Sequence, residues 1–152
     1  MFYDFTEGVP QGGPLSPLLA NIFLNEADHQ FETNRSNGKS STWVKLKLRQ
    51  IGQGWIQYFK LADMKSLLKR IDEWVRRRIR MSVWKTWKRV RTRYKYLQKL
   101  GINKYKAWQW ANTRKSYWRV AGSFILTRTL TNERIAKQGY ISLLDYYKLV
   151  KI

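Results

Sequence analysis

Apolar residues return at helical spacing through the middle of this 152-residue chain. Between Thr42 and Leu61 they recur every three or four positions, which predicts one apolar face of a helix. That face comprises Val44, Leu48, Ile51, Trp55 and Phe59. The next stretch predicts a longer helix that runs from an N-cap at Asp63 to about Lys88. Its apolar stripe comprises Met64, Leu67, Leu68, Ile71, Trp74, Val75 and Ile79.

Glycine and proline mark the ends and weak points of the N-terminal elements. The loop Gly8–Pro14 holds three glycines and two prolines, so no regular element is expected there. Ser16 and Pro17 are the predicted N-cap and first residue of a helix that reaches about Phe31. Its apolar side comprises Leu18, Leu19, Ile22 and Phe23. In the second helix, Gly52 and Gly54 indicate either a close approach of another segment or a bend.

Capping signals predict further short helices toward the C-terminus. Such helices are expected from near Arg91 to a cap at Gly101, from Asn103 through Trp108 and Ala111, between Thr131 and Gly139, and after the capping-box pair Ser142 and Asp145. Only Phe124–Thr127 indicates an extended segment. The pattern as a whole therefore predicts a mostly α protein.

Charge divides the chain into two unlike parts. Residues 1–34 contain no Lys or Arg and five acidic residues, a net charge of −5. Residues 35–152 contain all 30 basic residues and the other five acids, a net charge of +25. The boundary falls in a polar, turn-prone stretch. We therefore predict an N-terminal segment over residues 1–33, a linker over 34–41, a helical domain over 42–89 and a basic segment over 90–152.

The residue types present exclude several classes of site. The chain has no cysteine and a single histidine, His29, so thiolate zinc sites, disulfides and cysteine nucleophiles are excluded, and histidine metal sites or Ser-His-Asp catalysis are poorly supplied. No metal site is expected. The N-terminus lacks the basic start of a signal peptide, and the most apolar stretch, residues 14–24, is too short to span a bilayer. A soluble, cytoplasmic protein with no membrane partner is expected.

A net charge of +20 predicts a polyanionic partner, and nucleic acid is the common one. Between Lys65 and Arg119 there are 19 basic residues and two acids. Ordinary solvated faces mix charges of both signs, so this imbalance favours phosphate binding. The candidate phosphate contacts are Arg76, Arg77, Arg78, Arg80, Lys85, Lys88, Arg89, Arg91 and Arg93.

Aromatic residues alternate with the basic ones in the same region. Flat side chains stack on unpaired bases, which RNA presents in loops and bulges more often than duplex DNA does, so the pattern favours RNA. The candidate stacking residues are Trp84, Trp87 and Trp108. The alternative for each ring is a place in the core, because aromatic residues at helical spacing are usually buried.

Two parts of the chain resemble the group II intron reverse transcriptases. Residues 6–22, Thr-Glu-Gly-Val-Pro-Gln-Gly-Gly-Pro-Leu-Ser-Pro-Leu-Leu-Ala-Asn-Ile, resemble a motif of their polymerase domain. In that family the loop that corresponds to Pro10, Gln11, Gly12 and Gly13 lines the nucleotide and template site. Residues 35–39, 54–62 and 71–80 resemble the thumb or maturase-specific domain, and residues 108–115 and 130–133 resemble the segment that follows it.

The resemblance implies a helical bundle of the thumb or maturase type, with a short leftover loop and helix of the polymerase palm at the N-terminus. It also implies binding to structured RNA, group II intron RNA in particular, and contact with target DNA. The intact family helps its intron to splice and copies it into DNA, using Mg²⁺ held by an Asp-Asp pair.

This sequence departs from the family pattern at the catalytic centre. It contains no Asp-Asp pair, and it passes from the polymerase motif to the thumb within residues 28–34. An internally deleted protein that is no enzyme on its own and needs no cofactor is therefore expected. Two alternatives stay open: part of a split RNA-directed DNA polymerase completed by another chain, and a non-functional gene fragment.

Overall fold

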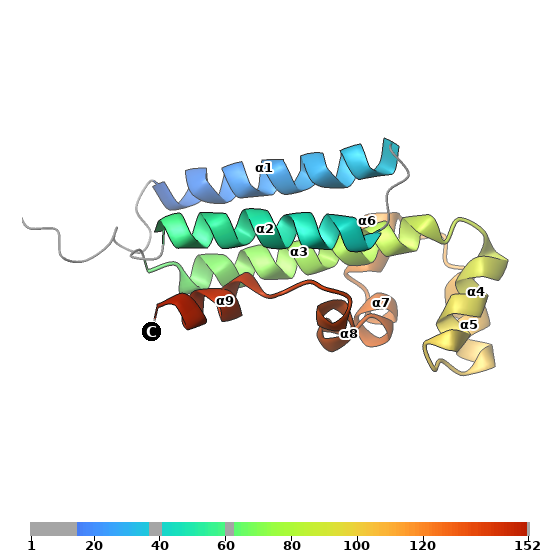
Figure 1. Ribbon diagram of the computed structural model, residues 1–152. Coiled ribbons are helices and arrows are strands. Elements are labelled where there is room, and N and C mark those ends of the chain that lie inside the picture. The colour runs from blue at the N-terminus through green and yellow to red at the C-terminus, as the bar shows by residue number, and fades with distance from the viewer. Residues whose placement is uncertain (1–14, 37–40, 60–62, 152) are drawn as a thin grey trace, which may run out of the picture. The chain divides into compact units, whose positions relative to one another are not determined.

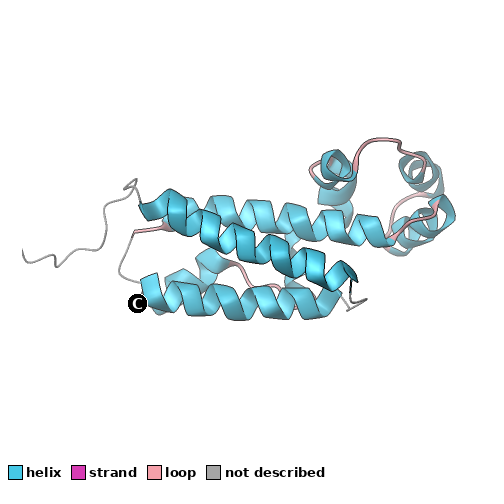
Figure 2. Cartoon of the chain, turned by 90° about the horizontal axis from the view of Figure 1, so that it is seen from above, coloured by secondary structure: helices cyan, strands magenta, loops and turns pink. Residues whose placement is uncertain are grey.

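The computed structural model describes residues 15–36, 41–59 and 63–151. Over these ranges it contains helices and no strand (Figures 1 and 2). The helices are α1 (Leu15–Ser36), α2 (Ser41–Phe59), α3 (Lys65–Thr86), α4 (Val90–Lys99), α5 (Lys104–Ala111), α6 (Tyr117–Ala121), α7 (Phe124–Thr129), α8 (Asn132–Lys137) and α9 (Leu143–Val150). The prediction of a mostly α protein is confirmed.

The chain forms two compact units. The first unit comprises residues 1–73 and 138–152, and the second unit comprises residues 74–137. The chain passes from the first unit into the second within α3 and returns after α8. Each unit has its own buried residues and is described separately below.

In the first unit, α2 packs against α1 and α9. Among residues 46–58, the part of α2 whose burial is described, the buried positions are Leu48, Gly52 and Ile56, which follow one another at intervals of four. The predicted face placed Trp55 in the stripe instead of Ile56, and Trp55 is only half-buried. A Cβ on Gly52 would collide with the side chain of Leu143. Gly52 therefore serves the close approach of α9, one of the two roles predicted for it.

The first helix is longer than predicted, because α1 continues past Phe31 to Ser36. Among residues 21–32, the part of α1 whose burial is described, Phe23 and Ala27 are buried and lie four residues apart. The Phe23 ring lies 5.7 Å from the Trp55 ring on α2. Ile22, predicted for the apolar side, is exposed. Helix α1 therefore packs on α2, and this contact covers Phe23.

Asp72 is a buried carboxylate that receives hydrogen bonds from four donors. Tyr140 Oη donates to Oδ1 at 2.6 Å, and Ser142 Oγ donates to Oδ2 at 2.6 Å. The backbone N–H groups of Leu143 and Leu144, in the first turn of α9, donate at 2.9 and 3.1 Å. These groups have no partner within their own helix. One carboxylate on α3 therefore holds the start of α9.

The predicted capping signals are confirmed at both ends of the C-terminal region. Ser142 is the N-cap of α9, and its Oγ accepts a hydrogen bond from the Asp145 N–H. The Gly101 N–H donates to the Gln98 carbonyl and the Ile102 N–H to the Leu97 carbonyl, which is the Schellman pattern. Gly101 adopts a φ of 90°, a conformation that glycine reaches without strain.

The long helix begins slightly later than its predicted cap. The first helical hydrogen bond runs from the Leu68 N–H to the Met64 carbonyl, so Asp63 lies one residue before the cap. The predicted stripe is buried except for the half-buried Trp74. The buried positions are Met64, Leu67, Leu68, Ile71, Val75 and Ile79.

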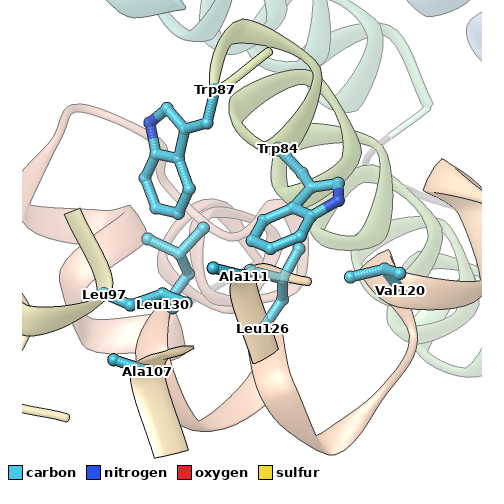
Figure 3. Close-up of a cluster of buried hydrophobic side chains, with 8 residues drawn as sticks. All are labelled: Trp84, Trp87, Leu97, Ala107, Ala111, Val120, Leu126 and Leu130. Atoms are coloured by element: carbon cyan, nitrogen blue, oxygen red, sulfur yellow. The ribbon is translucent and has the colours of Figure 1, made fainter. Parts of the chain in front are cut away.

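The second unit is built around Trp84 and Trp87. Their rings lie 5.8 Å apart, edge to face, and small or branched side chains of later helices surround them (Figure 3). These partners are Leu97, Ala107, Ala111, Val120, Leu126 and Leu130. Ala107 and Ala111 have only a methyl group each, which allows α5 to pack closely against α4.

The extended segment predicted at Phe124–Thr127 is wrong, since these residues lie in α7. Leu126 and Leu130 are both buried, and their spacing of four suits one face of a helix. The Thr127 N–H donates to the Ser123 carbonyl and begins the helical ladder. Burial at helical spacing therefore outweighed the weak strand preference of four residues. Helix α6 was not predicted.

Replacing Asp72 with alanine is expected to lower the free energy of unfolding by about 2–4 kcal/mol, because hydrogen bonds to a buried charge are lost and their donors stay buried. Urea denaturation followed by circular dichroism measures the change. Glu73→Ala is the matched control: this neighbouring carboxylate is exposed, and its loss should cost less than about 0.5 kcal/mol. Equal destabilisation by the two substitutions would contradict the role given to Asp72.

Candidate nucleic-acid interface

Positive charge is concentrated in the second unit. Residues 74–137 contain 19 Lys and Arg residues and one acid, Glu133, a net charge of +18. The residues of the first unit include 11 basic and nine acidic side chains, a net charge of +2. A polyanion is attracted most strongly where the cations gather. The second unit is therefore the candidate interface.

Arg80 was predicted to contact phosphate, and its surroundings give it a structural role instead. It is only 9% exposed. Its Nε donates to the Leu130 carbonyl at 3.0 Å, and its Nη2 donates to Asn132 Oδ1 at 2.8 Å. Burial lowers the pKa of the Arg80 guanidinium, and the positive charge of Arg76 lowers it further. Arg80 thus joins the end of α7 to the start of α8 and is not a surface contact.

Arg77 is half-buried and lies flat against Trp118. Its Cζ is 4.1 Å from the centre of the Trp118 ring, and its Nη2 donates to the Trp118 carbonyl at 3.1 Å. A Cβ on Gly122 would lie 2.8 Å from both Cζ and Nε of Arg77. The missing side chain at Gly122 therefore makes room for the guanidinium. This contact leaves Arg77 less available to phosphate than the sequence predicted.

Three more of the predicted phosphate contacts are half-buried and packed on aromatic rings. Arg78 lies over Trp74 at 5.5 Å, and Lys85 lies over Tyr117 at 5.8 Å. Arg93 lies over the Trp84 ring at 4.7 Å, and its Nε donates to the Trp87 carbonyl at 2.8 Å. These cations stabilise the unit from within, and their charge still adds to its field.

The exposed cations lie mainly beyond the long helix. Lys88, Arg89 and Arg91, all predicted contacts, are exposed. Lys95 and Lys99 follow Arg91 at intervals of four and are also exposed, on the side of α4 away from the buried Leu97. This spacing was visible in the sequence, yet neither lysine was among the predicted contacts. Other exposed cations of the second unit that the prediction omitted are Lys104, Lys106, Arg114, Lys115, Arg119, Arg128, Arg134 and Lys137.

The three tryptophans predicted to stack on bases differ in their exposure to solvent. Trp84 and Trp87 are 1% and 7% exposed and form the core, so neither ring is presented to a ligand. The alternative of a place in the core is the correct one for both. Trp108 is 62% exposed on α5 and remains a stacking candidate.

The loop residues Pro10, Gln11, Gly12 and Gly13 lie outside the described residues. Among the residues that are described, no group of three or more His, Cys, Asp or Glu side chains could hold a metal ion. None of the described helices is long and apolar enough to cross a membrane.

Comparison with known proteins finds similarity over part of the chain. Residues 31–101 match the model of the group II intron, maturase-specific domain. That domain is a splicing and RNA-binding domain and not a catalytic one. A stretch of 40 residues, 26% of this chain, is 50% identical to Protein YkfC of Escherichia coli (strain K12). The chain spans about a tenth of the length of this curated relative, since the match covers 10% of it.

Gly122→Ala is expected to push the Arg77 guanidinium off Trp118 and to lower the free energy of unfolding by about 1 kcal/mol, the scale of a cation–π contact. The backbone at Gly122 is helical, so alanine adds no backbone strain. Urea denaturation in the wild-type and Arg77→Met backgrounds measures the coupling between the two positions. In the Arg77→Met background, Gly122→Ala should no longer lower the free energy of unfolding. If it lowers this free energy as much as in the wild type, the contact between Gly122 and Arg77 is refuted.

Gly54→Ala is the control for this experiment. Gly54 lies in α2, and a Cβ there meets no atom within 4 Å. Alanine is the better helix former, so the substitution should stabilise the protein by up to about 1 kcal/mol.

Proposed function

From the premise that the chain carries a group II intron maturase-related segment over residues 31–101, we propose that it binds structured RNA, and group II intron RNA in particular, through its second unit. The observation that carries the proposal is the net charge of +18 on residues 74–137. The exposed cations Lys88 and Arg89, between α3 and α4, and Arg91, in the first turn of α4, offer phosphate contacts. Binding through such contacts releases counterions and is strongly salt-dependent.

We assign no polymerase chemistry to this chain. The polymerase mechanism needs carboxylates that hold two Mg²⁺ ions, and the sequence has no Asp-Asp pair to supply them. The motif at residues 6–22 is followed almost directly by the maturase-specific match, which is consistent with an internally deleted relative of the reverse transcriptases. The proposed RNA binding requires no cofactor.

Titration of the purified protein against a group II intron RNA tests the proposal. The competitors are a scrambled RNA of equal length and, separately, duplex DNA. A clear preference for the intron RNA is the expected result. Preferential binding of the duplex would favour the target DNA instead. Equal, steeply salt-dependent binding to all three would mean that only the charge operates, as in a non-functional fragment.

A primer-extension assay tests the remaining alternative, a split polymerase. The only feature that favours this alternative is the retained motif around Pro10–Gly13. DNA synthesis by the purified protein alone would contradict the assignment of no polymerase chemistry. Synthesis that appears only when a second chain is added would support the split enzyme.

Replacing Lys88, Arg89 and Arg91 together with glutamine is expected to reduce the salt slope of RNA binding by about 2 to 3, because each phosphate that is no longer neutralised lowers the slope by nearly one. Dissociation constants at several salt concentrations measure the slope. The matched control replaces Lys65, Lys69 and Arg70, which are exposed cations of the first unit, and removes the same charge. If the control lowers the slope as much, the second unit is not the specific interface.

A further inference from the structure

Helix α5 carries two large aromatic side chains that are exposed to solvent. Ala107 and Ala111 are fully buried, so they define the inner side of the helix. Tyr105 is 74% exposed and Trp108 is 62% exposed. Because successive residues turn by about 100°, the two rings lie next to each other, three positions apart. Tyr105 lies opposite the alanines, and Trp108 lies at the edge of the exposed side.

The other tryptophans of the second unit are engaged by the protein itself. Trp84 and Trp87 form the core, and Trp110 meets the Phe124 ring at 6.0 Å. Arg78 lies over Trp74 at 5.5 Å, and Arg77 lies over Trp118 at 4.1 Å. Within the part of the chain that the structure describes, no ring or cation contact engages Tyr105 or Trp108. Single exposed rings are common, whereas an adjacent exposed pair on a rigid helix indicates a surface that binds a partner.

The surroundings of the pair determine what kind of partner fits. Lys104 and Lys106 flank the rings on the same helix and are exposed, and the unit as a whole carries a net charge of +18. Gln109 is exposed beside the rings and carries an amide group of the kind that hydrogen-bonds to base edges. Asn112 is also exposed, but its Nδ2 already donates to the Trp108 carbonyl at 2.8 Å. Flat rings, amides and cations together match the bases and phosphates of a nucleic acid strand.

We propose that Tyr105 and Trp108 form a platform on which unpaired nucleotides stack, so that this face of α5 selects single-stranded or looped segments over duplex. The proposal rests on the proposed function, since it specifies which part of a structured RNA the second unit holds. A base within a duplex has its faces covered by its neighbours, whereas an unpaired base can lie on an exposed ring. The nearby lysines neutralise the phosphates of the same strand.

The test compares the wild-type protein with Tyr105→Ala/Trp108→Ala in binding to a short oligouridylate and to an RNA duplex of equal length. Loss of stacking is expected to weaken oligouridylate binding by about 5- to 100-fold for each base that stacks. Duplex binding and the salt slope should be unchanged, because neither side chain carries charge. An oligothymidylate arm distinguishes RNA from DNA as the source of the unpaired bases.

Two further variants keep the outcome interpretable. Tyr105→Phe/Trp108→Phe retains both rings and should keep most of the affinity for oligouridylate. Tyr58→Ala removes an exposed ring from the first unit, 81% exposed on α2, and should have no effect. Far-UV circular dichroism checks that each variant keeps its helices.

Either of two results overturns the platform: unchanged binding of oligouridylate by the double-alanine variant, or an equal loss for duplex and oligouridylate. Both leave salt-dependent RNA binding by the wild type in place, so the proposed function would survive them. Failure of the wild-type protein to bind any RNA would instead overturn the proposed function.

Discussion

Repulsion among the cations of the second unit is the constraint on which the rest of its structure depends. Ion pairs cannot relieve it, because residues 74–137 contain one acid for 19 basic residues. Backbone carbonyls and aromatic rings take the place of carboxylates. Arg80 and Arg93 donate to the carbonyls of Leu130 and Trp87, and Arg134 donates to those of Leu100 and Thr129. Carbonyls near helix ends lack partners and carry partial negative charge, so they suit these guanidinium groups.

These contacts stabilise the second unit and leave its net positive charge unchanged. Carbonyls and rings accept the guanidinium groups but carry no net charge, so the field of the unit persists at its surface. The exposed lysines and arginines after Trp87 add to that field where a strand can reach them. A polyanion would therefore relieve the remaining repulsion, and binding and folding stability are expected to reinforce each other. By the same reasoning, the half-buried arginines would strengthen the proposed RNA binding through their charge alone.

The first unit differs from the second in having nearly balanced charge and a buried carboxylate, Asp72. Asp72 accepts hydrogen bonds from two hydroxyl groups and two backbone N–H groups of the segment that leads into α9. Gly52 leaves room for Leu143 of the same helix. Phe23 and Ala27 give α1, which also packs on α2, a buried face.

The sequence by itself determined the helical class, the caps at Gly101 and Ser142 and the concentration of charge, because periodicity, caps and composition are local properties. The Gly101 and Ser142 caps and the stripe from Met64 to Ile79 follow from such signals. Only the tertiary structure decided which rings and cations face solvent. Trp84 and Trp108 are the same residue type, as are Arg80 and Arg91. Trp84 and Arg80 are buried, however, whereas Trp108 and Arg91 are exposed. Burial depends on residues far along the chain, such as Leu126, Leu130 and Asn132, whose packing no local pattern encodes.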